Sequence, residues 1–333
     1  MTTTYDVPTT AARAGQVLDQ VGTAVIGKAA SLRLVLAGIL AGGHVLLEDF
    51  PGLGKTLAAR SFAQSLGLDF TRAQFTPDLL PADLTGSFVY DQGRHEFEFR
   101  KGPVFTGLLL ADEINRTPPK TQAALLEAMQ ERQVTVEGTT FPLAAPFHVL
   151  ATANPIEYEG TYPLPEAQLD RFLLRVGFGY PTAAQEDDVL AARLARRREQ
   201  IDLRAVTDAD GLLAMQACVE TVEVDPTVRE YCVSLAHATR QHADVLTGAS
   251  PRGSLALVLT ARALAVIAGR DFVLPEDVKA VATAVLAHRL TLRPELWMST
   301  VTTASVIDDV LGQIATPPAV RGVREAEGLG TPG

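Results

Sequence analysis

The sequence predicts an α/β fold in which a parallel sheet lies between helices, followed by a smaller all-α domain. Between about residues 44 and 178, short apolar runs typical of buried parallel strands alternate with helical patterns. From Pro181 onward the strand patterns stop and apolar residues recur at helical spacing. We therefore expect a core over 1–180, a helical lid domain over 181–315 and a flexible, proline- and glycine-containing tail over 316–333.

The individual elements of the first domain follow from the same patterns. Residues 9–42 read as two helices separated by a glycine break at 25–28. Two hairpins are expected at 87–99 and 134–141, where residues alternate with a period of two around turn residues. Strands are expected at 44–48, 69–73, 105–111, 147–152 and 172–176, and further helices at 55–66 and 119–131.

The second domain is expected to be helical throughout. Pro275-Glu276-Asp277 is a good helix start, because proline and acidic residues suit the first turn. The predicted helices are 183–200, 208–219, 226–246, 253–269 and 275–289.

Composition limits the classes of function. The net charge is −10, which argues against a broad, non-specific grip on nucleic acid. The N-terminus shows no apolar secretory signal, and the longest nearly apolar stretch, 34–47, is too short to span a bilayer. We expect a cytoplasmic protein with no direct membrane insertion, in which Cys218 and Cys232 are buried apolar residues in a reducing compartment.

One loop is the most informative segment of the chain. Residues 48–56 lie between an apolar run and a helical pattern that opens at Leu57. A strand, a glycine-containing loop and a helix N-terminus bind phosphates through backbone N–H groups, while Lys55 reaches the β/γ oxygens and Thr56 binds Mg²⁺. Asp49 stands where the P-loop pattern has its first glycine, so the loop alone also fits an ordinary strand-to-helix turn. The candidate nucleotide-binding residues are Pro51, Gly52, Leu53, Gly54, Lys55, Thr56 and Leu57.

Two further apolar strands end in polar residues suited to phosphate chemistry. The run 108–111 leads into Asp112 and Glu113. Asp112 can hold Mg²⁺ through water, and Glu113 can orient and deprotonate an attacking water. The run 149–153 leads into Asn154, whose side chain can bond the γ-phosphate and the water, although Asn-Pro alone is most often a turn starter.

Two arginines are placed at junctions. Arg171 lies between a helical and a strand pattern, and Arg252 begins a helix of the second domain. Guanidinium groups suit the planar charge of a phosphoryl group in transfer. Each arginine also has a simpler interpretation. Arg171 could form a surface ion pair with Asp170, and Arg252 could be an exposed loop residue.

Taken in order, these motifs resemble those of the AAA+ ATPases, and within them the MoxR family. The resemblance covers roughly residues 15–290, and Asp49 at the first glycine position is usual in that family. The stretches that carry it are Val25-Ile26-Gly27-Lys28, Ala151-Thr152-Ala153-Asn154-Pro155 and residues 48–56, 74–81, 112–120 and 165–172.

The resemblance implies a role for each matched residue. Asn154 corresponds to the sensor-1 residue, Arg252 to the sensor-2 arginine and Arg171 to an arginine finger that acts on the nucleotide of the next subunit. Val25, Ile26 and Gly27 are expected to line the adenine pocket, with ATP and Mg²⁺ as the cofactors. Further residues expected to face a neighbouring subunit are Asn115, Arg116 and Lys120.

Similar proteins form hexameric rings and act as chaperone-like remodellers or activators of partner proteins. The partners implied by the resemblance are von Willebrand factor A domain proteins, and the outcomes are metal insertion or complex assembly. A non-hydrolysing nucleotide switch is one alternative, and a DNA-processing motor is another. The hairpin turn 91–96 carries one arginine against two acidic residues, which disfavours DNA threading, so no nucleic-acid partner is expected.

Overall fold

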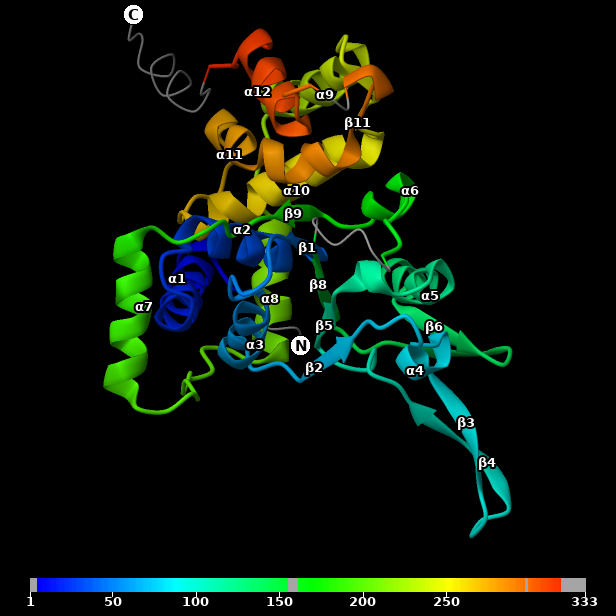
Figure 1. Ribbon diagram of the computed structural model, residues 1–333. Coiled ribbons are helices and arrows are strands. Elements are labelled where there is room, and N and C mark those ends of the chain that lie inside the picture. Colours follow the sequence, from blue (N-terminus) through cyan, green and yellow to red (C-terminus); the bar gives the residue numbers. More distant parts are fainter. Residues whose placement is uncertain (1–4, 155–160, 297–298, 319–333) are drawn as a thin grey trace, which may run out of the picture.

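The computed structural model describes residues 5–154, 161–296 and 299–318, and its centre is a five-stranded parallel sheet (Figure 1). The strand order is β2-β5-β8-β1-β9. The five predicted strands are confirmed, although 105–111 begins later because residues 102–107 form turns before the strand. The strands are β1 (Val45–Glu48), β2 (Phe70–Gln74), β5 (Leu108–Asp112), β8 (His148–Ala153) and β9 (Leu174–Val176).

The register of this sheet brings three strand ends to one edge. Ala151 of β8 pairs with Leu46 of β1 on one side and with Ala111 of β5 on the other. Because all three strands run parallel, the residues that follow them emerge together at the carboxyl edge. The P-loop, the Asp112-Glu113 pair and Asn154 are therefore neighbours.

Helices cover both faces of the sheet. Alternate strand residues face opposite sides: Leu47 and Leu110 pack with α1, α2 and α3, whereas Leu46 and Leu109 pack with α5. The predicted break at 25–28 is confirmed, because it separates the first two helices. The elements of this part are α1 (Val7–Ala24), α2 (Ala29–Leu40), α3 (Lys55–Ser65), α5 (Pro119–Glu131) and the short α4 (Pro81–Thr85), η1 (Ile114–Arg116) and α6 (Glu166–Leu169).

Both predicted hairpins are present. The first, β3 (Gly86–Asp91) with β4 (Glu96–Lys101), extends away from the body, and the second is β6 (Gln133–Val136) with β7 (Thr139–Pro142) (Figure 1). Phe99 stacks on Phe141 with ring centroids 3.9 Å apart. This contact holds the two hairpins together, so the first projects from a fixed base.

The C-terminal part is mainly helical, with two differences from the sequence expectation. The predicted helix 226–246 is wrong at its end, because His242 is extended and the chain enters a strand, β10, that pairs antiparallel with β11. The predicted helix 183–200 ends at Arg196, where left-handed Arg197 caps it. The elements are α7 (Ala183–Arg196), α8 (Ala209–Glu220), α9 (Pro226–Gln241), β10 (Val245–Thr247), α10 (Pro251–Ile267), α11 (Pro275–Leu286), η2 (Ala287–Arg289), β11 (Thr291–Leu292), η3 (Pro294–Leu296) and α12 (Thr303–Gln313).

The expected boundary at residue 180 does not divide the hydrophobic core. Met215 of α8 and Leu257 of α10 belong to the same buried cluster as Val17 of α1 and Leu36 of α2. The division into domains at that residue therefore stays a prediction. The expected tail lies outside the described residues from position 319 onward.

Two further expectations concern burial. Cys218 and Cys232 are both buried and free, as expected, and burial raises the pKa of the Cys232 thiol to about 12. Among the residues that the structure describes, no helix has the length and apolar character needed to cross a membrane.

Two buried histidines at the starts of β1 and β8 are held in their neutral form. His44 accepts a hydrogen bond at Nδ1 from the Val149 N–H (2.9 Å) and lies 3.1 Å from the Met129 carbonyl at Nε2. His148 lies 2.9 Å from the Gly43 carbonyl at Nδ1 and receives the Gln216 amide at Nε2. Burial, with the second histidine, lowers the pKa of His44 to about 3, and burial lowers the pKa of His148 to about 4.

These histidines predict acid sensitivity of folding at mild pH. In the unfolded chain each imidazole takes up a proton near its ordinary pKa of 6.5, whereas the folded protein keeps it neutral. The stability they provide is complete above about pH 6.5 and is lost as the pH falls toward the folded pKa values. Thermal unfolding should show a falling melting temperature between pH 6.5 and 5.

The control separates this effect from general acid titration. His148→Gln should flatten the slope over that interval, while His237→Gln at an exposed position should leave it unchanged. A wild-type melting temperature that is constant from pH 6.5 to 5 would contradict the account.

Candidate active site

The P-loop turns at two glycines and delivers Lys55 to the start of α3. Gly52 and Gly54 have φ of +81° and +87°, a left-handed region that residues with a Cβ adopt only with strain. Gly54 is the N-cap of α3, so the free N–H groups of its first turn face the loop. The predicted strand–loop–helix arrangement is confirmed.

A cavity of about 430 Å³ lies at this edge of the sheet. The P-loop forms one wall, and the ends of β2, β5 and β8 form the other. Most of the residues expected to bind nucleotide or metal share this one cavity. Its lining consists of Pro51, Gly52, Leu53, Gly54, Lys55, Thr56, Leu57, Arg72, Asp112, Glu113, Thr152, Ala153 and Asn154.

Lys55 joins the two walls. Its Nζ donates to the carbonyl oxygens of Asp49 and of Ala153, the latter at 3.3 Å. Burial lowers the pKa of this ammonium group, while the carboxylates of Asp49, Asp112 and Glu113 act to raise it. The cationic charge therefore sits between the P-loop and the end of β8, where a phosphate chain would lie.

Asp49 explains the departure from the glycine pattern. Its carboxylate accepts the backbone N–H groups of Phe50 (2.8 Å), Phe178 (2.6 Å) and Gly179 (2.5 Å). A glycine at this position would leave those donors without their acceptor. The side chain therefore ties the P-loop to the segment that follows β9.

The same segment is held from a second side. Lys28 Nζ donates to the Gly179 carbonyl (2.8 Å) and Ser31 Oγ to the Gly177 carbonyl (2.8 Å). Phe50 of the P-loop stacks on Tyr180, with ring centroids 5.4 Å apart. The P-loop and the approach to α7 thus form one bonded unit.

The Asp112-Glu113 pair is fixed by residues that the sequence did not reveal. Buried Thr152 donates to Asp112 Oδ1 (2.6 Å) and accepts the Glu113 N–H (2.8 Å). Arg72 pairs with Asp112 Oδ2 at 2.7 Å. Both residues lie inside predicted strands, where an alternation of apolar and polar residues does not distinguish structural from functional side chains.

Two neighbouring side chains contact one oxygen of the Glu113 carboxylate. Gln74 Nε2 donates to its Oε2 (2.8 Å), and Arg116 Nε lies 3.2 Å from the same oxygen. Glu113 itself has φ of +60°, a conformation that costs energy outside glycine and is often found at functional sites. Of the residues expected to face a neighbouring subunit, Arg116 is thus bonded within its own chain.

Thr56 and Asp112 fit Mg²⁺ in the kind of donor they supply. Both line the cavity, and a hydroxyl with a carboxylate is the oxygen set that this ion uses alongside waters and substrate phosphates. Among the described residues there is no cluster of three or more His, Cys, Asp or Glu that could hold a metal alone.

Asn154 lies where the sequence expectation placed it, at the end of β8 in the cavity lining. The Asn115 amide donates to its backbone carbonyl (3.1 Å). The three residues expected to surround adenine do not line this cavity. Of them, buried Val25 lies beside the P-loop, because a Cβ at Gly54 would be 4.0 Å from Val25 Cγ1.

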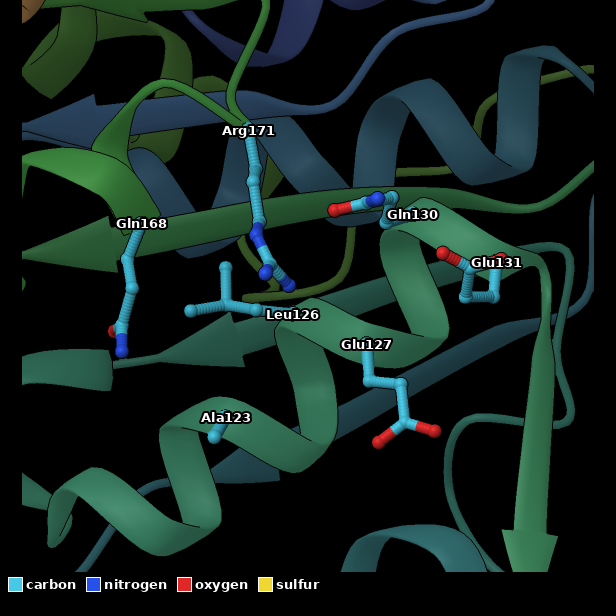
Figure 2. A pocket seen from close by; sticks show the side chains of 7 residues that line it. All are labelled: Ala123, Leu126, Glu127, Gln130, Glu131, Gln168 and Arg171. Atoms are coloured by element: carbon cyan, nitrogen blue, oxygen red, sulfur yellow. The ribbon is translucent and has the colours of Figure 1, made fainter.

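Arg171 and Arg252 lie away from this cavity. Arg171 lines a separate groove of about 280 Å³ formed by α5 and the end of α6 (Figure 2). Its neighbour Asp170 is bonded to Arg289 Nε (2.8 Å) and to Ser250 Oγ (3.1 Å), so the simpler interpretation of Arg171 as the ion-pair partner of Asp170 is wrong. Arg252 is exposed and stands two residues after Ser250, whose hydroxyl bonds Asp170, so it lies in the same region.

A P-loop, paired carboxylates and a polar strand end around one cavity define an ATPase of the AAA+ class. Residues 44–174 match the family model described as ATPase family associated with various cellular activities, and residues 237–310 match the AAA lid domain. The crystal structure of a protein from Cytophaga hutchinsonii assigned as an ATPase superposes with a TM-score of 0.87 and 40% identity, covering 94% of this chain and 97% of that one.

Two relatives place the chain more closely. Chaperone MoxR1 of Mycobacterium tuberculosis is 44% identical over 88% of this chain and 79% of its own length. The uncharacterized protein YeaC of Bacillus subtilis is 46% identical over 93% of this chain and 97% of its own length. The chain belongs to the MoxR family of AAA+ ATPases.

The hydrogen bonds of the Asp49 carboxylate predict that substitution of this residue weakens nucleotide binding. Asp49→Asn keeps the side-chain shape but leaves one oxygen for three N–H donors, so the P-loop should lose its fixed position. We expect the affinity for a fluorescent ATP analogue to fall roughly tenfold and the free energy of unfolding by about 1–3 kcal/mol. Asp78→Asn, at an exposed position outside the site, is the control, and unchanged affinity in Asp49→Asn would contradict a positioning role.

Proposed function

We propose that the protein hydrolyses ATP in a Mg²⁺-dependent reaction and uses it to remodel or activate partner proteins. The observation that carries this proposal is the meeting of Lys55, Thr56, Asp112, Glu113 and Asn154 around one cavity. These residues come from two strand ends and a helix start that are far apart in sequence. Their convergence supports phosphoryl transfer by positioning and charge stabilisation, with no covalent intermediate.

Each side chain has a task in hydrolysis. Lys55 and the N–H groups of the P-loop hold the β- and γ-phosphates, and Asn154 orients the γ-phosphate and the attacking water. Glu113, held by Gln74 and Arg116, takes a proton from that water as its oxygen bonds to the γ-phosphorus and the bond to ADP breaks. Mg²⁺, held by Thr56 and Asp112, would neutralise charge on the phosphate oxygens.

The position of Arg171 supports assembly into a ring. Arg171 lines a groove separate from the cavity of its own chain, which supports a role for its guanidinium in the transition state on a neighbouring protomer. Such a contact is head-to-tail and closes by rotation, and we propose the hexamer that the family resemblance implies. Exposed Arg252 lies in the same region, because nearby Ser250 bonds Asp170. We propose that it faces the same neighbouring nucleotide.

The projecting β3–β4 hairpin is the proposed contact for the client. Its side chains Tyr90 and Phe97 are 46% and 69% exposed, and they pack edge-to-face with centroids 5.3 Å apart. One relative is named a chaperone, which supports a remodelling activity. We propose clients that include von Willebrand factor A domain proteins, with metal insertion or complex assembly as the outcome, and a cytoplasmic location.

Substitution of the base should separate binding from turnover. Glu113→Gln keeps the phosphate and metal contacts but removes the proton acceptor, so we expect ATP affinity close to wild type and turnover reduced by about 10²–10⁴-fold. Lys55→Ala should lose nucleotide binding. A phosphate-release assay with near-normal turnover for Glu113→Gln, or its complete failure to bind ATP, would contradict the role given to Glu113.

Mixing variants tests whether Arg171 acts on a neighbour. Arg171→Ala should assemble normally and lose about 10³–10⁵-fold in turnover. Mixed with Lys55→Ala, it should regain activity, because an intact site of one chain then meets an intact arginine of the other. Lys101→Ala on the hairpin is a matched control for loss of a cation. If no mixing ratio restores activity, the arginine does not act in trans.

A further inference from the structure

Helix α7 presents an amphipathic surface that its own chain leaves uncovered. None of its side chains is buried. Val189, Leu190 and Leu194 are 44%, 59% and 75% exposed, although aliphatic side chains of this size are normally removed from water. The helix stands at one side of the molecule (Figure 1), so its outer face is available to another chain.

Basic residues lie beside these aliphatic ones. Arg193 follows Val189 by four residues on the helix, and Leu190 and Leu194 form the adjacent row. Arg197 is the left-handed residue that caps the C-terminus of the helix. Both arginines are exposed, and neither forms an ion pair within the described residues. The surface is thus a short aliphatic strip with two exposed arginines at the C-terminal end of the helix.

The opposite side of the molecule carries a groove of matching charge. In the groove of Arg171, Glu127 and Glu131 of α5 are also spaced four residues apart, on the exposed side of the helix beside Ala123 (Figure 2). Neither carboxylate forms an ion pair within the described residues. Exposed Ala123 also lines the groove, so the groove offers negative charge beside a small apolar side chain.

A buried polar atom also marks the groove as incomplete. Gln168 Oε1 is buried and has no hydrogen-bond partner in the described part of the chain, and the same residue lines the groove. A buried acceptor without a donor is costly. A donor brought by another chain would remove that cost.

We propose that α7 of one protomer docks onto α5 of the next, with Arg193 and Arg197 facing Glu127 and Glu131. The occupant of the groove is a second copy of this chain. The inference rests on the proposed head-to-tail ring and gives it a specific contact: α5 and α6 lie on the side of Arg171, and α7 lies on the other side of the molecule (Figure 1). Since Asp49 bonds the P-loop to the segment leading into α7, the same contact connects each nucleotide site to the neighbouring chain.

Charge-reversed variants of the full chain test the contact. Arg193→Glu with Arg197→Glu, and separately Glu127→Arg with Glu131→Arg, place like charges in the interface. Assembly is measured by sedimentation velocity in the presence of Mg²⁺ and a non-hydrolysable ATP analogue. Each variant should need a protein concentration at least about tenfold higher than the wild type to assemble. Asp188→Lys, on the opposite side of α7, should assemble as the wild type does.

An equal mixture of the two reversed variants provides the decisive result. In an alternating ring every glutamate-bearing α7 meets an arginine-bearing α5, and every arginine-bearing α7 meets the native glutamates, so assembly should recover. Assembly of each variant at the wild-type concentration would overturn the proposal, as would a mixture without recovery. Binding of a fluorescent ATP analogue is measured in parallel on the wild type and on the unassembled variants. A wild type that does not bind the analogue would contradict the nucleotide site and not the α7 contact.

Discussion

The site depends on the register of three parallel strands. Ala151 pairs with Leu46 and with Ala111 across adjacent strands, and this row fixes where the chain leaves the sheet after each one. A shift by one residue in β5 would turn Asp112 to the opposite face. The buried side chains on both faces, which make such a shift costly, are therefore what keeps the phosphate-binding loop opposite its carboxylates.

A second set of contacts extends this geometry beyond the sheet. Asp49 bonds the loop to the segment after β9, and Asp170 bonds the segment before β9 to Ser250 and Arg289 of the helical part. The short strand β9 thus lies between two carboxylates that reach different parts of the molecule. These bonds connect the P-loop to the approach to α7 and the segment before β9 to α10.

The sequence predicted the elements with a strong local pattern. Apolar runs predict the five strands, with Asp112, Glu113 and Asn154 at the ends of two of them and Lys55 at the start of the helix that follows the P-loop. The sequence does not predict residues whose role depends on partners distant in the chain. Thr152 and Arg72 look like ordinary strand residues, and their contacts with Asp112 arise only because β5 lies between β2 and β8. The predicted helix 226–246 overlaps the strand Val245–Thr247, whose partner, Thr291–Leu292, lies far along the chain. Asp49 departs visibly from the P-loop pattern, but two of the N–H donors that bond its carboxylate, Phe178 and Gly179, lie far along the chain and have no local sequence pattern.

The most direct test of this account is a structure of the assembled Glu113→Gln protein with ATP and Mg²⁺. The account predicts the γ-phosphate between Lys55 and residue 113 of one protomer, with Arg171 of the adjacent protomer within hydrogen-bonding distance of it. A nucleotide bound at another edge of the sheet, or a γ-phosphate approached only by side chains of its own chain, would contradict it.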